Sequence, residues 1–263
     1  MADAYVAQMK GVLLSEGPPD LQLVDLSHAL PRGDVIAGAL FLEAAVPRFP
    51  GGTVHLVVVD PGVGSARRIL VATLPDRAGG APQHVVAPDN GLLEPLLART
   101  EDARLIAIDV DGLARDTVSA TFHGRDLMAP VAARLAWGMA PAALATTVTD
   151  PVQLGLPVPR RDGALTHGQV LHVDHFGNLI TNLTASVLPS NQGAQLRARL
   201  AGQAIGPLRT HYAQVEPGEL LLLWDSGGRL EIAVRDGSAA DRLGVERHAE
   251  VSVEVVDVLE TGG

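Results

Sequence analysis

The chain has 263 residues, a length that favours one large domain or two unequal ones. Its formal net charge of -10 argues against nucleic-acid binding, because few cations remain to neutralise a phosphate backbone; the charge suits a cationic small molecule, and a solvated acidic surface explains it equally well. The absence of cysteine excludes a disulfide scaffold, a thiolate metal site and a cysteine nucleophile.

The first residues, MADAYVAQMK, do not combine a basic region with an apolar run, so we expect no signal peptide. No apolar stretch approaches the roughly 20 residues that cross a bilayer. We therefore expect a soluble, cytoplasmic protein without a membrane partner.

In chain order, the first part of the sequence predicts strands that alternate with helices. A helix is expected over residues 4–15, a strand over 21–26, and a helix that begins after a cap at Asp34. The remaining strands are expected at residues 56–59, 69–73, 84–87 and 103–108, with helices at 92–97 and 125–137. The strand at 84–87 runs into a Pro-Asp-Asn-Gly turn. This alternation predicts an α/β domain with a central, mostly parallel sheet.

The character of the sequence changes after Ala145. Three prolines and little periodicity in TDPVQLGLPVPRRDGALTHG predict a linker over residues 149–166. Strands are expected beyond it at residues 170–173, 220–224, 230–234 and 251–256. We therefore predict an N-terminal α/β domain over residues 1–148 and a smaller, β-barrel-like domain over residues 167–263.

The stretch HLVVVDPGVGSARR reads as a buried strand that ends in Asp60. An acid at the carboxyl end of a strand occupies the edge where open α/β sheets bind ligands. Gly62 and Gly64 permit a close approach of backbone or ligand, and Arg67 returns a permanent cation to the same edge. A strand, an Asx turn and a solvated basic loop would explain the same residues.

Three further clusters carry polar side chains at element boundaries. His123, in TFHGRD, precedes a helix and suits a general base or a residue that holds water; packing in a loop is the alternative. DHFGN offers the carboxylate of Asp174, an aromatic face and an amide that suits a purine edge, or is simply a hairpin turn. SGGRLEIA alone reads as a turn before a strand. An oxygen-rich metal site is a weaker alternative, and its ligands would be Asp60, Asp89, His123 and Asp126.

Taken in order, five motifs resemble the S-adenosyl-L-methionine (SAM) hydrolases, or SAM hydroxide adenosyltransferases, which are relatives of the fluorinases and chlorinases. The motifs are VVDPGVGSARR, APDNGLL, TFHGRDLMAPVAARLA, DHFGNLITN and LEIAVRDGSAADRLG. The resemblance extends over nearly the whole chain. It implies an N-terminal α/β domain, a smaller β domain and a homotrimer with active sites between subunits. It also implies SAM as substrate, adenosine and L-methionine as products, and no cofactor or metal.

The resemblance assigns the family's catalytic set to Asp60, Arg67 and His123. Water or hydroxide would attack the 5′-carbon of the ribose, and the sulfonium needs no acid because it is already a good leaving group. Arg67 would stabilise hydroxide character, while Asp60 or His123 orients the water or takes its proton. Substrate-binding roles fall on Asp174 for the ammonium group, Ser226 for the carboxylate, Phe176 and Asn178 for adenine, and Glu231 and Asp3 towards the methionine end.

Departures from the family pattern define the alternatives. Fluorinase-type relatives have a tyrosine in place of Asp60 and a halide-contacting serine in place of Gly124, and both differences favour water over halide. An aromatic residue that flanks the adenosine in the halogenases is Gly33 here. The family's Thr-Asp-Phe-Gly segment, whose aspartate binds the ribose, would precede Met1. We therefore expect either an upstream start or a truncated chain. The alternatives are a non-catalytic adenosine- or SAM-binding protein, a halide-using SAM transferase and, more distantly, a metal-dependent hydrolase.

Overall fold

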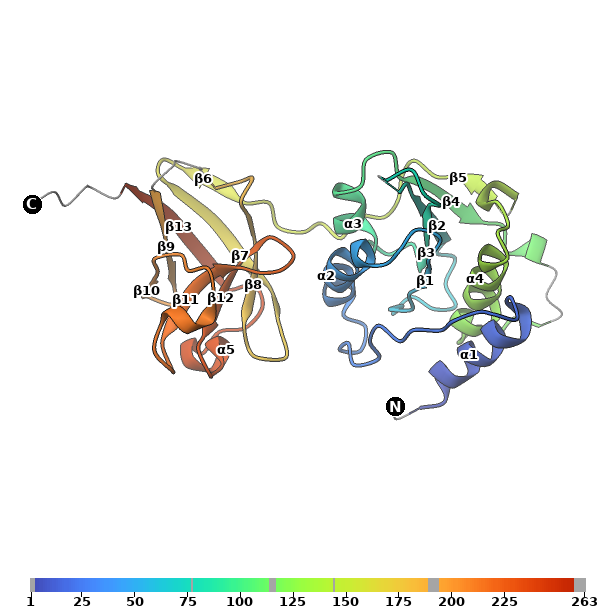
Figure 1. Ribbon diagram of the computed structural model, residues 1–263, viewed down its shortest axis with the longest axis horizontal. Helices are drawn as coiled ribbons and strands as arrows, with labels where there is room; N and C mark the ends of the chain where they lie inside the picture. Colours follow the sequence, from blue (N-terminus) through green and yellow to red (C-terminus); the bar gives the residue numbers. More distant parts are fainter. Residues whose placement is uncertain (1–2, 77, 114–116, 144, 189–193, 258–263) are drawn as a thin grey trace, which may run out of the picture. The chain divides into compact units, whose positions relative to one another are not determined.

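The computed structural model describes residues 3–76, 78–113, 117–143, 145–188 and 194–257 (Figure 1). The chain divides into two compact units, residues 1–154 and 155–263. None of the helices in the described ranges combines the length and the apolar character that a membrane crossing requires.

The N-terminal unit is built on a 5-stranded mixed sheet in the order β1-β3-β2-β4-β5. Its strands are β1 (Val54–Leu56), β2 (Ile69–Leu74), β3 (Gln83–Pro88), β4 (Arg104–Ile108) and β5 (Ala145–Thr147). The α/β class is confirmed, but the expectation of a mostly parallel sheet is wrong. Among the strand pairs of the described residues in this sheet, β1–β3 is parallel, whereas β2–β3, β2–β4 and β4–β5 are antiparallel. The link between β2 and β3, residues 75–82, is too short for the crossover of about a dozen residues that parallel neighbours need.

Helices cover both faces of this sheet (Figure 1). The unit contains α1 (Tyr5–Glu16), α2 (Val35–Ala45), α3 (Glu94–Ala98) and α4 (Ala129–Ala136), the short 3-10 turns η1 (Val46–Arg48), η2 (Asp111–Leu113) and η4 (Pro141–Ala143), and the π-turn η3 (Gly124–Met128). On one face, Leu42 of α2 and Leu96 of α3 join a core with Val85 of β3. On the other face, Val131 of α4 packs with Val71 of β2, and α1 lies against α4.

The predicted helices at 4–15 and after Asp34 are confirmed. The Asp34 side chain accepts a hydrogen bond from the backbone N–H of Ala37 at 2.9 Å, as an N-cap does. The predicted strand at 21–26 is wrong, because this segment has no strand partner among the described residues. Side-chain contacts hold it instead, since Asp25 binds Lys10 at 2.7 Å and His28 at 2.9 Å.

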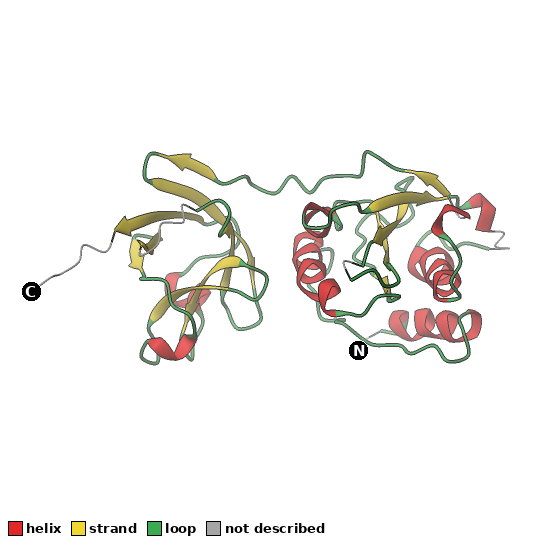
Figure 2. Cartoon of the chain, turned by 45° about the horizontal axis from the view of Figure 1, so that its top comes forward, coloured by secondary structure: helices red, strands yellow, loops and turns green. Residues whose placement is uncertain are grey.

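The C-terminal unit is an antiparallel 8-stranded sheet that curls into a nearly closed barrel (Figure 2). Its elements are β6 (Arg160–Asp162), β7 (Leu165–Val173), β8 (Leu179–Thr184), β9 (Ala194–Leu200), β10 (Gln203–Ile205), η5 (Tyr212–Gln214), β11 (Leu220–Trp224), β12 (Arg229–Val234), α5 (Ala239–Leu243) and β13 (Glu250–Asp257). Seven strands follow the order β10-β9-β13-β7-β8-β12-β11, and the eighth, β6, pairs with β7 off this path. A bridge between Leu208 and Leu222 brings the two ends of the order together. The expected barrel-like β architecture is confirmed.

Alternation along the strands separates the inside of the barrel from the outside. Leu230 and Ile232 of β12 join the main core of the barrel, which is lined by aliphatic side chains of the neighbouring strands. The intervening residue, Glu231, points to the opposite face because side chains alternate along a strand.

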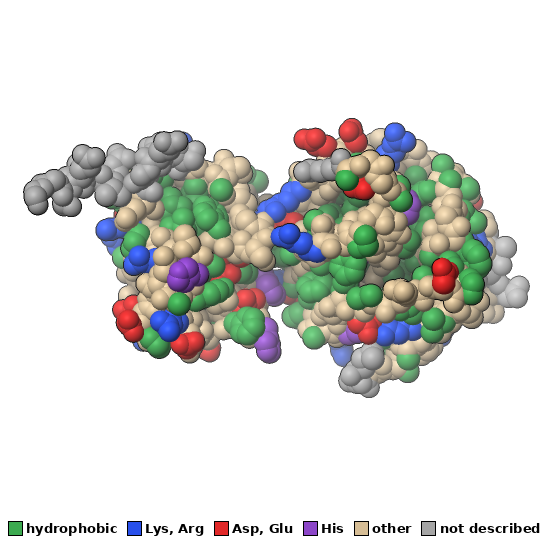
Figure 3. All heavy atoms as spheres, viewed as in Figure 1, with side chains coloured by type: hydrophobic (Ala, Val, Ile, Leu, Met, Phe, Trp, Pro, Cys, Tyr) green, Lys and Arg blue, Asp and Glu red, His purple; other side chains and the backbone are tan. Residues whose placement is uncertain are grey.

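Over the face drawn in Figure 3, Lys and Arg side chains lie scattered among Asp and Glu instead of forming one basic patch.

Candidate active site

The N-terminal unit brings two loops into close contact at the end of the β1 segment. β1 ends at Leu56, earlier than predicted, yet the backbone N–H of Val57 still donates to Val86 of β3 at 3.0 Å. The chain then leaves the sheet at Asp60. Gly64 has a φ of +83°, and any side chain there would collide with the backbone carbonyl oxygen of Ala120. Glycine at position 64 therefore lets the loop after Asp60 lie directly against the loop that carries His123.

Asp60, Arg67 and His123 meet where these two loops touch. The Arg67 guanidinium donates from Nε to Asp60 Oδ1 at 2.7 Å and from Nη2 to Asp60 Oδ2. Nη2 also lies 3.3 Å from Nδ1 of His123. The side chains of Arg67 and Asp60 are only 9% and 3% exposed, so this bidentate ion pair is almost entirely shielded from water. The structure thus brings together the three residues to which the family resemblance assigns catalysis.

Two electrostatic features distinguish this cluster from a purely structural ion pair. Burial, and then the adjacent Arg67 cation, hold the pKa of His123 below its usual range, although Asp60 and Asp126 oppose the shift. With Nδ1 facing the guanidinium, the neutral ring carries its proton on Nε2. In addition, Nη1 of Arg67 is buried and has no hydrogen-bond partner among the described residues. A buried cationic donor of this kind is costly unless a ligand or water binds it.

The loop that carries His123 is fixed by the residues around it. Arg125 pairs with Asp126, whose carboxylate also accepts from the backbone N–H of Ser119 at 2.9 Å. The Arg125 guanidinium lies 4.9 Å from the ring centre of Phe122, which Tyr5 contacts edge-on. The TFHGRD motif indicated this region, but the sequence did not show that Tyr5 of α1 also contributes to it. The π-turn that follows His123 is a feature often found at functional sites.

The turn between β7 and β8 holds three of the predicted substrate-binding residues. Asp174 organises the turn, because its carboxylate accepts from the backbone N–H groups of Phe176 at 2.8 Å and Asn178 at 2.9 Å, and from the Asn178 amide at 3.0 Å. Asn178 is buried, whereas the Phe176 side chain is 73% exposed. The turn therefore presents an aromatic face to solvent on a rigid base.

Glu231 lies between this turn and the one that carries Ser226. The register pairs Ile232 with Leu179 and Arg229 with Thr184, so Asn178 is near one end of β12 and Ser226 is beyond the other. Glu231 is 4% exposed and accepts a hydrogen bond from the Tyr212 hydroxyl at 2.7 Å. Burial, reinforced by the charges of Asp174 and Asp225, raises its pKa to about 7, although the Tyr212 bond lowers it. Sequence reasoning missed Tyr212, which no motif indicates.

The structure does not group the other candidates. Asp3 is exposed just before α1. The described residues contain no cluster of three or more carboxylates and histidines with the geometry to hold a metal ion. Among the four residues of the metal alternative, the three carboxylates pair with arginines, as Asp60–Arg67, Asp89–Arg68 and Asp126–Arg125.

The chain is similar in sequence and in structure to other proteins over nearly its full length. The profile of the SAM hydroxide adenosyltransferase N-terminal domain matches residues 1–145, and that of the C-terminal domain matches residues 168–252. The (R)-S-adenosyl-L-methionine hydrolase of Salinispora tropica is 42% identical over 253 residues, which cover 93% of this chain and 90% of that protein. The protein of the same name from Thermus thermophilus is 36% identical over 261 residues, with 94% and 92% covered. A crystal structure of an uncharacterized conserved protein from Thermotoga maritima matches with a TM-score of 0.83 at 31% identity, covering 96% of both chains.

Proposed function

The chain belongs to the SAM hydroxide adenosyltransferase family, and on this premise we propose that it hydrolyses S-adenosyl-L-methionine to adenosine and L-methionine. The observation that carries the proposal is the buried Asp60–Arg67 pair beside His123, in which one guanidinium nitrogen lacks a partner among the described residues. A site that holds one water or hydroxide beside a cation, away from bulk solvent, supplies what hydrolysis of a sulfonium needs.

In the proposed step, the water oxygen forms a bond to the 5′-carbon of the ribose. The carbon–sulfur bond breaks, and its electron pair neutralises the sulfonium to the thioether of methionine. Nη1 of Arg67 donates to the attacking oxygen and stabilises its developing negative charge. The proton of the water passes to Asp60 or His123, the two acceptors beside the guanidinium. The lowered pKa favours a neutral His123, whose Nδ1 can take the proton only in exchange for its contact with Nη2 of Arg67, because Nε2 already carries the ring proton.

We assign substrate binding to residues of both units. In the C-terminal unit, we assign Phe176, whose ring is exposed, to stacking on the purine and Asn178 to hydrogen-bonding it, and Ser226 beyond the other end of β12 to the methionine carboxylate. Asp174 and Glu231 supply negative charge for the ammonium end. Asp3 is assigned to the methionine end on family resemblance alone.

Incubation of the purified chain with SAM, without added halide or metal, is expected to release adenosine and methionine in equal amounts, measured by chromatography. The same assay with fluoride or chloride is expected to give no 5′-halo-5′-deoxyadenosine. Halogenated product would assign the chain to the halide-using transferases instead. Calorimetric binding of SAM without turnover would replace the hydrolase proposal with a binding protein, and loss of turnover in chelator would require a metal.

We also propose a homotrimer in which each active site combines the Asp60 cluster of one subunit with the substrate-binding turns of its neighbour. The proposal is supported by the family resemblance and by the location of the two residue groups in different compact units. Mixed trimers of Arg67→Ala and Ser226→Asp chains are then expected to regain roughly one quarter of wild-type turnover, since a heterologous interface leaves some sites intact. Sites confined to one subunit would regain none. Sedimentation of the wild-type chain supplies the mass of the assembly.

A further inference from the structure

The Pro-Asp-Asn-Gly turn at the end of β3 contacts both ends of the loop that carries Asp60 and Arg67. At the first end, the Asn90 side-chain amide donates to the backbone carbonyl of Val59 at 2.9 Å. Val59 is the residue immediately before Asp60. The amide oxygen of Asn90 accepts from the backbone N–H of Leu92 at 3.3 Å, which fixes the orientation of the donor. Asn90 thus anchors the point where the chain leaves the sheet.

At the second end, Asp89 holds the residue immediately after Arg67. The backbone N–H of Asp89 donates to the carbonyl of Arg68 at 3.0 Å, and the Arg68 Nε donates to the Asp89 carboxylate at 2.6 Å. The Asp89 side chain is only 3% exposed. Consecutive residues of one turn therefore tie down both flanks of the loop, which spans residues 60–67.

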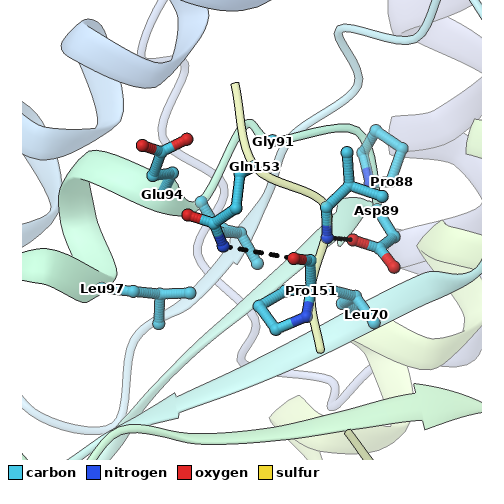
Figure 4. A pocket seen from close by; sticks show the side chains of 10 residues that line it. Leu70, Pro88, Asp89, Gly91, Glu94, Leu97, Pro151 and Gln153 are labelled. Atoms are coloured by element: carbon cyan, nitrogen blue, oxygen red, sulfur yellow. Dashed lines mark hydrogen bonds between the residues drawn. The ribbon is translucent and has the colours of Figure 1, made fainter. Parts of the chain in front are cut away.

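Residues 150–154, which we call the strap, run beside the turn, and Figure 4 shows Pro151 and Gln153 of the strap next to Asp89 and Gly91. The second carboxylate oxygen of Asp89 accepts from the backbone N–H of Val152 at 2.8 Å, and Arg68 binds the Asp150 side chain at 2.8 Å. Gly91 has a φ of +92°, and a Cβ there would lie 2.7 Å from the Leu154 side chain. The buried carboxylate of Asp89 is therefore shared between the strap and the flank of the loop.

We propose that Asn90 and Asp89 are positioning residues for the hydrolysis, which act by fixing the two ends of the Asp60–Arg67 loop. The expected effect on kcat rests on the proposed function, whereas the expected displacement of the Asp60–Arg67 loop beside His123 does not. The bidentate pair of Asp60 and Arg67 closes within a short loop, so a shift of either flank displaces the guanidinium that faces His123. Displacements of this kind, on the order of 1 Å, can cost about 100-fold in rate.

The test uses Asn90→Asp, which keeps the shape of the side chain and the acceptor for Leu92 but removes the donor to Val59. We expect kcat for SAM to fall by about 10- to 100-fold while KM stays within about threefold, because the substrate contacts are not altered. The ring resonances of His123 in NMR spectra are expected to move. Asn90→Ala, which adds no charge, is expected to move them as well.

Gln83→Glu is the matched control at the opposite end of β3. Its amide donates to the carbonyl of Phe49 at 2.6 Å and its oxygen contacts His55 at 2.9 Å, so the substitution removes a donor and adds a charge in the same way. We expect the resonances of His55 to move, those of His123 to stay, and kcat to remain within about threefold. Thermal unfolding of both variants separates loss of positioning from loss of stability.

Retention of kcat in Asn90→Asp and Asn90→Ala, with unchanged His123 resonances, would overturn the inference. An equal fall of kcat in Gln83→Glu would overturn it too. If the Asn90 variants do not fold, Asp150→Ala loosens the other flank, because it removes one partner of Arg68 and leaves the buried Asp89 paired; the Asp150 side chain is 80% exposed, so the fold tolerates the change. If the wild-type chain does not turn over SAM, the proposed function fails, and the His123 resonances alone decide the inference.

Discussion

Arg67→Ala is expected to lower kcat for SAM hydrolysis by about 100- to 1,000-fold, the usual cost of removing one donor that faces developing negative charge. The variant removes the bidentate partner of Asp60 and the unpartnered Nη1 to which we assign the nucleophile. It also removes the cation that lowers the pKa of His123. The pKa of that ring is therefore expected to rise, which NMR titration measures independently of turnover.

Arg99→Ala provides the matched control for this prediction. Arg99 pairs with Glu43 at 2.7 Å, and the Glu43 side chain is 5% exposed, close to the 3% of Asp60. Arg67→Ala leaves a buried carboxylate without its arginine, at a cost of roughly 3–5 kcal/mol of stability. Arg99 is 43% exposed against 9% for Arg67, so Arg99→Ala is expected to lose less thermal stability and to keep its kcat, whereas Arg67→Ala loses both. Equal kcat in the two variants would remove Arg67 from the mechanism.

The residues of the catalytic proposal could be found from sequence because each lies in a local motif with its own chemistry. Asp60 ends a hydrophobic run, and Arg67 follows within one glycine-containing loop. Their contact with His123 spans 56 positions, and the sequence could order the motifs without showing that the loops touch. That contact depends on Gly64 passing close to Ala120, which is a property of the fold. Catalytic roles for the three residues stay a proposal.

Strand direction was less accessible. The periodicity identified β2, β3 and β4, but it does not encode whether neighbours run parallel, and the short link at residues 75–82 was the available clue. β9 was not predicted, although Leu196, Ala198 and Leu200 alternate with polar residues as a half-buried strand requires. Tyr212 was missed because its role depends on packing over β12, and no local pattern records that contact.

Glu231→Gln is expected to stabilise the C-terminal unit at neutral pH. The pKa of Glu231 rises from 4.5 to about 7 on folding, so the folded state holds the proton more strongly than the unfolded state. The contribution of Glu231 to the free energy of unfolding is then highest below pH 4.5, falls as the pH rises towards 7 and stays low above it. The loss is on the order of 3 kcal/mol. Glutamine keeps the acceptor for Tyr212 and cannot ionise, so the loss disappears.

Urea unfolding at several pH values, followed by Trp224 fluorescence in a Trp137→Phe background, measures this difference in the unit that contains Glu231. Wild type and Glu231→Gln are expected to coincide near pH 4.5 and to diverge up to about pH 7. The hydrogen bond from Tyr212 lowers the pKa of Glu231, so Tyr212→Phe is expected to raise this pKa further. The stability of Tyr212→Phe is then expected to keep falling relative to Glu231→Gln up to a higher pH than that of the wild type. Parallel curves for all three chains would show that Glu231 does not titrate in this range.

The same variants separate a structural role of Glu231 from a role in binding. Ionisation of Glu231 weakens the fold. A role of its negative charge in binding the cationic substrate would explain why the chain has a carboxyl group there, since functional groups often cost stability. We then expect KM for SAM to rise in Glu231→Gln above pH 7, where the wild-type group is charged, and to match wild type at low pH, where both are neutral. A gain in stability with no change in KM at any pH would leave Glu231 without a part in substrate binding.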